Sequence, residues 1–186
     1  MSNAQRFIRP IALTAGLLAG IAVLAQGPFS ASAQIKTDEQ FRADVIDREG
    51  KNTGSVVVQQ TPSGVVLLTV SVTGLTQGWH GIHIHETGRC DPEDGFKSAG
   101  GHLAEGKDHG LMSENGPHPG DMPNQMVQEG GVMVAEVFTL LTNAKEQLMD
   151  ADGSAFIIHS NRDDYTSQPA GNAGERVACG VFKRPE

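Results

Sequence analysis

Cysteines, positive charges and long apolar runs are all scarce in this sequence of 186 residues. The longest apolar run, residues 11–25, is shorter than the roughly 20 residues that a membrane-spanning helix needs. No cysteine precedes Cys90, and this argues against a lipid-anchored lipoprotein. The sequence also has no internal repeat and no helical heptad, which argues against repeat and coiled-coil proteins.

The shortage of positive charge gives the chain a net charge of −8, with 14 Lys and Arg residues against 22 Asp and Glu residues. Acidic proteins are poor partners for nucleic acids and for anionic membrane surfaces. We therefore expect no nucleic-acid partner. If the substrate is an anion, the protein needs a local region of positive potential to attract it.

The first 33 residues have the order of an export signal. Two arginines come first, the short apolar run follows, and the small residues Ala31-Ser32-Ala33 match the site that a signal peptidase cleaves. A buried helix or a membrane anchor is the alternative. We expect residues 1–33 to be removed as a signal peptide, and the protein to be periplasmic or secreted with no stable membrane anchor. Residues 34–186 then form one domain with a net charge of −10, because the signal carries two arginines and no acidic residue.

The only two cysteines, Cys90 and Cys179, both lie in the part that we expect to be exported. Oxidising compartments favour disulfides, so we expect these two residues to pair. Two free buried thiols are the alternative. Closing so long a loop stabilises a fold by about 4 to 5 kcal/mol through the entropy of the unfolded chain.

Apolar residues recur with the short period of strands along the rest of the chain. We expect eight strands, at residues 41–46, 55–60, 65–72, 79–85, 132–140, 146–150, 155–159 and 176–182. The segment 141–149 could hold a helical turn, but its apolar residues are sparse and we favour a strand. Two long irregular segments remain, 86–131 and 160–174, and such segments inside a compact domain are usually functional or disordered. The pattern predicts an all-β fold, an eight-stranded antiparallel Greek-key sandwich or flattened barrel with two long functional loops.

Two histidines share one face of an expected strand. Side chains alternate along a strand, so His83 and His85 point to one face while Ile82 and Ile84 point into the core. The pair can grip a metal ion, although a His-x-His also occurs without metal on solvent-exposed strands. By the same parity His80 lies on the core side, and we expect it to be structural or on the surface.

The segment 86–131 adds three histidines and a carboxylate, His102, His109, His118 and Asp121. Zinc takes such nitrogen and oxygen ligands in a tetrahedral arrangement, and a loop rich in Gly and Pro can bring them to one ion. Metal binding would also order a loop that has few apolar residues to bury. A solvated polar loop with unrelated histidines is the alternative, in which Asp121 is a turn residue.

Once His159 is included, the pattern as a whole resembles the copper/zinc superoxide dismutase family over nearly all of the exported part. The motifs that carry the resemblance are Gly81 to Glu86, Gly100-Gly-His102, His118-Pro-Gly-Asp121, His159 with Asp163-Asp164, and Gly171 to Val181. The resemblance implies one copper and one zinc ion per chain. The copper ligands that it implies are His83, His85, His102 and His159, and the zinc ligands are His102, His109, His118 and Asp121. His102 would bridge both ions as an anion, which the summed charge of two dications favours.

The resemblance also gives roles to residues that spacing alone leaves open. Asp163 would link a copper ligand to a zinc ligand and hold each imidazole in its tautomer, and it is otherwise a turn residue. Arg176 would attract and orient an anionic diatomic beside the copper, although most arginines are ordinary surface residues. Cys90 and Cys179 match the disulfide of the family. Further cations are candidates for the positive region, namely Lys97, Lys107 and Arg162.

The activity that the resemblance implies is the disproportionation of superoxide to dioxygen and hydrogen peroxide, with Arg176 and His102 as catalytic residues. Superoxide is then the partner to expect, and the sequence leaves the choice between monomer and homodimer open. A copper-delivery module would need neither Arg176 nor a zinc bridge. An adhesion-type sandwich would leave the histidines unexplained, and a copper-only dismutase would lack the zinc ligands that are present here.

Overall fold

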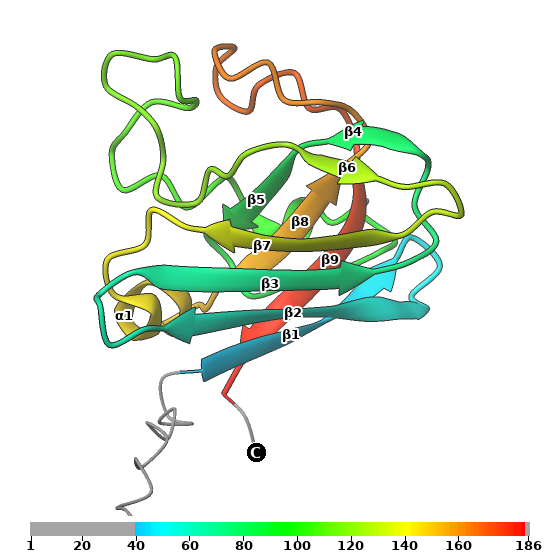
Figure 1. The fold of residues 1–186 in the computed structure, drawn as a ribbon, viewed down its shortest axis with the longest axis horizontal. Helices are drawn as coiled ribbons and strands as arrows, with labels where there is room; N and C mark the ends of the chain where they lie inside the picture. The colour runs from blue at the N-terminus through cyan, green and yellow to red at the C-terminus, as the bar shows by residue number, and fades with distance from the viewer. Residues whose placement is uncertain (1–39, 185–186) are drawn as a thin grey trace, which may run out of the picture. The chain divides into compact units, whose positions relative to one another are not determined.

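The computed structural model describes residues 40–184, which consist mostly of antiparallel strands (Figure 1). The expected signal peptide, residues 1–33, lies outside the described residues. In chain order the elements are β1 (Gln40–Asp47), β2 (Asn52–Gln60), β3 (Val66–Val72), β4 (Gly78–His80), β5 (Ile82–His85), a 3-10 turn (Lys97–Ala99), β6 (Gln125–Val127), β7 (Met133–Phe138), α1 (Ala144–Leu148), β8 (Ala155–His159) and β9 (Arg176–Lys183). Within the described range, no helix has the length and hydropathy needed to cross a membrane.

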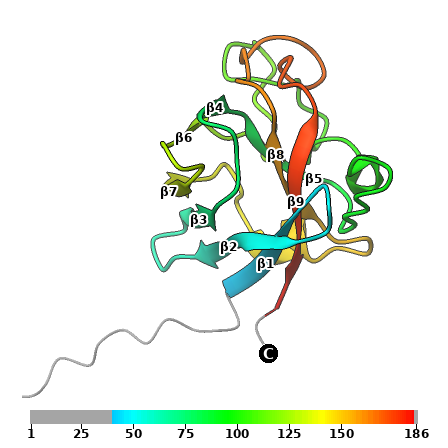
Figure 2. The ribbon, with the colours of Figure 1, turned by 90° about the vertical axis from the view of Figure 1, so that its right-hand side faces the viewer.

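Seven strands form one curled sheet, in the order β5-β8-β9-β1-β2-β3-β7, and every neighbouring pair is antiparallel. β4 and β6 form a separate two-stranded ribbon. β4 leads directly into β5 at one end of the sheet, and β6 lies against β7 at the other end. The ribbon therefore bridges the two ends of the sheet and closes it into a flattened barrel (Figures 1 and 2). The prediction of an all-β antiparallel fold is confirmed.

The strands beneath the long loops are buried on both faces. The first strands bury alternate residues, as β1 does with Phe41, Ala43 and Val45. By contrast, every residue of β5 and β8 is buried. On β5, Ile82 and Ile84 join the main apolar core. The two histidines that alternate with these isoleucines therefore point to the opposite face, where the loop 86–131 covers the histidines.

One expected strand, 146–150, is wrong, because its first three residues belong to the helix α1 and the other two form a bend. Asn143 caps the helix by accepting a hydrogen bond from the backbone N–H of Glu146 at 3.2 Å. Ala144 and Leu148 lie one turn apart and are both buried. Two apolar residues are enough to cover the inner face of so short a helix, so their sparseness in the sequence does not indicate a strand.

The expected strand 79–85 is interrupted at Gly81, and a strand that the sequence did not reveal pairs with its first part. This is β6, three residues within the segment 86–131, which pairs with β4. A strand of three residues is too short to show an alternating pattern. The structure thus has nine strands within the described range instead of the eight expected.

Gly81 is the point at which the loop after β8 lies against the barrel. Its N–H donates to the carbonyl of Asn161 at 2.8 Å, and its carbonyl accepts from the N–H of His159 at 2.9 Å. A Cβ on Gly81 would lie 3.1 Å from the Cβ of Ala173 and 3.3 Å from the Cβ of Asp163. Both distances are shorter than ordinary carbon contacts, so glycine permits the loop to approach this closely.

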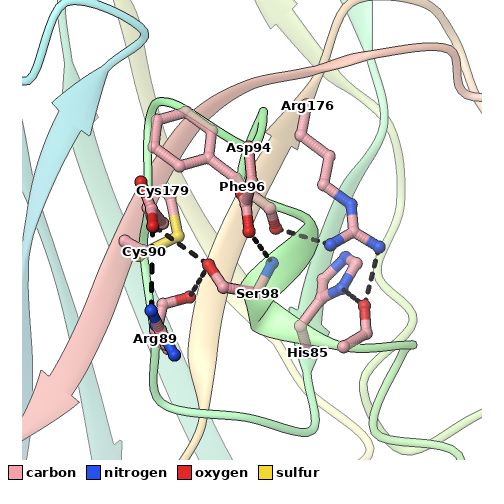
Figure 3. Close-up of a disulfide and its surroundings, with 10 residues drawn as sticks. His85, Arg89, Cys90, Asp94, Phe96, Ser98, Arg176 and Cys179 are labelled. Atoms are coloured by element: carbon pink, nitrogen blue, oxygen red, sulfur yellow. Dashed lines mark hydrogen bonds and ion pairs between the residues drawn. A yellow bond between two sulfur atoms is a disulfide. The ribbon is translucent and has the colours of Figure 1, made fainter.

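Cys90 and Cys179 form a disulfide, with their Cα atoms 5.7 Å apart (Figure 3). The bond ties the loop 86–131 to β9. A small second core lies beside it, separate from the main one, and consists of Phe96, Ala99, Ala155, Ile157 and Cys179. The disulfide therefore holds the start of the loop onto its own patch of buried apolar residues.

We predict that replacing both cysteines by serine lowers the free energy of unfolding by about 2 to 5 kcal/mol, because a cross-link restricts the unfolded chain. The linked residues are 89 positions apart, which makes the effect large. Urea unfolding of the wild-type protein and the double variant, at the same metal loading, measures the difference. Equal unfolding midpoints would contradict the prediction.

Candidate metal centre

Three histidines project from two paired strands into the space beneath the loops. His83 and His85 lie two residues apart on β5, and His159 is the last residue of β8. Because β5 and β8 are antiparallel neighbours, the rings converge. The ring centroid of His159 lies 4.8 Å from that of His83 and 5.7 Å from that of His85.

The loop 86–131 returns to β5 and adds a fourth ring. The backbone of His102 pairs with that of His85 in a single antiparallel β-bridge. In the first group, which comprises His83, His85, His102 and His159, one nitrogen of each ring lies within 4.8 Å of the others. All four residues are buried.

One nitrogen of each ring in the first group has no hydrogen-bond partner among the residues that the structure describes. These nitrogens are Nδ1 of His83 and Nε2 of His85, His102 and His159, and each is fully buried. A buried polar atom without a partner costs free energy, so four of them around one space need an explanation. A cation bound between them would give each nitrogen a partner.

Acceptors hold the opposite nitrogens of three of these rings. Nε2 of His83 donates to Oδ2 of Asp163 at 2.7 Å, and Nδ1 of His85 donates to the carbonyl of Gly100 at 3.1 Å. Nδ1 of His159 lies 3.4 Å from another backbone carbonyl. Each acceptor favours the proton on the nitrogen that faces it, which leaves the unpartnered nitrogen as a lone pair that can bind metal.

The second group surrounds one carboxylate oxygen. Nδ1 of His102, His109 and His118 lie 3.0, 3.0 and 3.3 Å from Oδ1 of Asp121. The nitrogens of His102 and His118 lie 3.4 Å apart. Tetrahedral zinc, with bonds of about 2.0 to 2.1 Å, separates its ligand atoms by about 3.3 Å, so the spacing fits one zinc ion. The second oxygen of Asp121 accepts from the N–H groups of Gly110 and His118, which fixes the carboxylate.

Asp163 lies between the two groups and is fully buried. Its Oδ2 binds Nε2 of His83, and its Oδ1 lies 3.1 Å from Nε2 of His109. Asn124 holds the backbone of Asp163 with two hydrogen bonds, of 2.9 and 2.8 Å. His83 also lies close to His102, His109 and Asp121. We place it in the first group, because one of its nitrogens is bound to Asp163 and the other is unpartnered.

Arg176 lies beside the first group, at the start of β9 (Figure 3). Its Nη1 donates to the carbonyl of Phe96 at 2.6 Å, and its Nη2 donates to the carbonyl of Gly100 at 2.7 Å. The Gly100 carbonyl also accepts from Nδ1 of His85. A single backbone oxygen thus holds a ring of the first group and a half-buried cation next to each other.

The sequence matches one protein family, described as copper/zinc superoxide dismutase (SODC), over residues 52–182. The chain belongs to the copper/zinc superoxide dismutase family. Its relatives include a superoxide dismutase [Cu-Zn] of Caulobacter vibrioides, 44% identical over 142 residues that cover 73% of this chain and 80% of the relative. Superoxide dismutase [Cu-Zn] 1 of Aquifex aeolicus is 41% identical over 160 residues, 83% of this chain and 92% of the relative.

Solved structures of the family superpose on the described barrel. The Cu/Zn superoxide dismutase from Brucella abortus matches 78% of this chain and 100% of its own, with a TM-score of 0.66 and 29% identity. A SOD-like protein from Bacillus subtilis matches 75% of this chain and 96% of its own, with a TM-score of 0.68 and 35% identity. The likeness therefore extends over most of both chains.

The structure brings together all the residues that the family resemblance implies as ligands, with Asp163 between the two groups and Arg176 beside the first. The ion that each side chain binds stays a prediction.

The three further cations that were candidates for a positive region around the site lie on the surface. Lys97, Lys107 and Arg162 are all exposed, and Arg162 lies over the ring of Trp79 at 6.0 Å from its centroid. An open cavity of about 480 Å³ beside Arg176 is lined by equal numbers of opposite charges, Arg48, Lys97 and Arg176 against Glu93, Asp94 and Glu175.

His80 has a position that the sequence did not fully reveal. Alternation placed it correctly on the buried side, and its exposed fraction is 2%. Its Nδ1 lies 2.6 Å from the carbonyl of His159, and its Nε2 lies 2.8 Å from the carbonyl of Thr76. The ring therefore supports the backbone of a residue in the first group. No sequence signal indicates such a contact, because it joins residues 79 positions apart.

Burial determines the charge of the first group. It lowers the pKa of His83, and it lowers the pKa of His85 and His159 well below the ordinary value of 6.5. Burial also lowers the pKa of His102 to about 4. The four imidazoles are therefore neutral at pH 7, which is the form that binds metal.

The charge of His109 is controlled by the two buried carboxylates. Burial alone would lower the pKa of His109, but hydrogen bonds to Asp121 and Asp163 raise it to about 9. Although burial opposes ionisation, the same bonds hold the pKa of both carboxyls well below the usual range. Both carboxylates therefore stay charged near neutral pH, and zinc binding would displace a proton from His109.

We predict that the metal-free protein is most stable near pH 7, where the opposing effects of the lowered and raised histidine pKa values balance. The four lowered pKa values mean that the unfolded chain takes up protons first as the pH falls from 6.5 through about 4, so the free energy of unfolding decreases. The raised pKa of His109 gives a contribution that is present below 6.5 and lost as the pH rises through about 9. Urea unfolding of metal-free protein at acid, neutral and alkaline pH measures this. Stability that rises as the pH falls below 6.5 would refute the argument.

Proposed function

We propose that this protein disproportionates superoxide to dioxygen and hydrogen peroxide, using one copper and one zinc ion. The observation that carries the proposal is the set of four buried, unpartnered nitrogens with Arg176 beside them. Bound copper supplies the electron transfer, accepting an electron from one superoxide and giving an electron to another. Membership of the copper/zinc superoxide dismutase family supports both the metals and the reaction.

We assign copper to the first group, whose members are His83, His85, His102 and His159. Imidazole nitrogens suit copper, and each of the four has a lone pair directed at the same space. We assign zinc to the second group, whose members are His102, His109, His118 and Asp121. Three nitrogens and one oxygen at tetrahedral spacing complete a zinc site without an open position, as in structural zinc sites.

His102 is the residue common to both sites. Its Nδ1 faces Asp121 in the second group, and its Nε2 is the unpartnered nitrogen in the first group. With both ions bound, the neutral ring would lose its one remaining N–H proton. Whenever copper does not hold it, Nε2 would be free to take up a proton and pass it on. Peroxide formation consumes two protons, and the second would come from water.

Arg176 is suited to receive the anion. Its guanidinium stays charged and carries five N–H donors, only two of which are used by the carbonyls of Phe96 and Gly100. Those two bonds fix the plane of the group and leave the other donors for a substrate. In a protein with a net negative charge, this fixed cation is the local attraction that an anionic substrate needs.

We further propose that residues 1–33 direct export and are removed, so that the enzyme works in the periplasm or outside the cell as residues 34–186. The disulfide between Cys90 and Cys179 supports this compartment, because disulfides persist in oxidising environments. The intact mass of the exported protein tests the cleavage site.

We predict that replacing His102 by Ala disturbs both metals, whereas replacing His118 by Ala releases chiefly zinc. The reason is that His102 supplies a nitrogen to each group and His118 supplies one to the second group only. Elemental analysis of each variant after loading with both metals and removal of the excess measures the result. A fully loaded wild-type protein that contains a single metal would sink the two-metal assignment.

We predict that Arg176→Glu slows turnover more than Arg176→Ala does, and that Arg176→Lys retains part of the rate. Fixed local charge raises association rates by about 10- to 1000-fold, and salt reduces the gain. Lysine keeps the charge but loses the planar fork that reaches two carbonyls. Superoxide consumption at low and high salt measures the effect, with exposed Lys107→Ala as the control. Full activity of Arg176→Ala at low salt, or loss of its metals, would refute the role.

A further inference from the structure

A glutamine outside both metal groups holds the main chain of His109. Oε1 of Gln168 accepts from the N–H of His109 at 2.9 Å, and Nε2 of Gln168 donates to the carbonyl of His109 at 2.8 Å. The side-chain amide thus pairs with this residue as a neighbouring strand would. Ser113, from the same loop as His109, makes the only other hydrogen bond to the His109 main chain within the described residues.

The loop that carries Gln168 also holds the ring of His109. Oδ1 of Asp163 lies 3.1 Å from Nε2 of that ring. Close by, the carbonyl of Tyr165 accepts from the N–H of Met112 at 3.1 Å. The loop 160–174 therefore fixes His109 at its amide, its carbonyl and its ring. Nδ1 of His109 lies 3.0 Å from Oδ1 of Asp121, in the position of a zinc ligand.

We propose that Gln168 is a positioning residue for zinc, which holds His109 in place and so limits the rate at which zinc leaves the protein. The role rests on the proposed function, in which His109 is a zinc ligand. Zinc can leave only after its ligands detach, and Nδ1 of His109 cannot move far while its backbone and its Nε2 are held. Of these restraints, Gln168 supplies both bonds to the backbone from the neighbouring loop.

Because of its surroundings, Gln168 can be replaced with little effect on overall stability, so its effect on zinc release can be measured separately. Its side chain is exposed, so shortening or replacing it opens no cavity in either core. Each net hydrogen bond of this kind changes an equilibrium by about 2- to 10-fold, so the loss of both bonds should speed zinc release by about 5- to 100-fold. The copper site should be unaffected at the start, because among the described residues Gln168 makes no hydrogen bond to a member of the first group.

Two variants of similar size separate the two bonds. Gln168→Leu removes both of them. Gln168→Glu keeps an acceptor for the N–H of His109 but removes the donor and places a negative oxygen near the carbonyl. Gln128→Glu makes the same change of charge at an exposed glutamine in the turn before β7 and is the matched control. Val58→Ala, in the main core, lowers stability without touching either loop.

The experiment follows zinc release from protein loaded with copper and zinc, in the presence of an excess of chelator, while the copper spectrum and the urea midpoint are recorded. Gln168→Leu should release zinc about 5- to 100-fold faster than the wild type and Gln168→Glu, which loses one bond, about 2- to 10-fold faster. The Gln128 and Val58 variants should release it at the wild-type rate. In metal-free protein, the amide hydrogen of His109 should exchange faster in Gln168→Leu than in the wild type, and this readout does not depend on activity.

Each other outcome has a distinct meaning. Unchanged zinc release in both Gln168 variants, from a wild type that binds zinc, would overturn the positioning role and leave the proposed function intact. Equal acceleration in Gln128→Glu or Val58→Ala would overturn it as well, because charge or stability alone would then explain the effect. Wild-type protein that binds no zinc would overturn the zinc assignment, and the positioning role with it.

Discussion

Six imidazoles and two carboxylates share one small buried region, and the rest of the structure depends on how their charges and lone pairs are balanced. Four nitrogens face a common space without a partner, and three more surround a single carboxylate oxygen. Buried lone pairs at such distances are unfavourable unless cations lie between them. The arrangement of these groups therefore fits two dications, and bound ions would add to the disulfide, the second apolar core and the hydrogen bonds that hold the two loops.

The barrel strands supply some of the side chains of this site and the two long loops supply the others. Alternation along β5 sends two isoleucines into the core and two histidines toward the loops, so the same strand anchors the fold and the first group. The second group comes wholly from the loop 86–131. Asp163, from the other loop, touches one ring of each group and makes the two halves a single unit.

Strand alternation and the family resemblance together were enough to predict the barrel and the residues that gather at the site, but contacts through the backbone were not predictable. His83 and His85 could be placed on one face because side chains alternate. The helix α1 was missed because capping by Asn143 and burial of two residues replace a clear apolar period. The contacts of His80 with a carbonyl, and of Gln168 with a main chain, join residues 79 and 59 positions apart. Only the folded geometry brings such pairs together.

Gly81 shows how a break in a strand can serve a site that lies elsewhere in the sequence. It separates β4 from β5, and it is also the place where the loop with Asp163 comes nearest to the barrel. A methyl group there would lie 3.3 Å from the Cβ of Asp163 and from Cε1 of His83, so the two residues joined by the 2.7 Å contact would have to shift by a few tenths of an ångström. The side chain that position 81 can carry is therefore limited by a loop some 80 residues downstream as well as by the two strands that flank it.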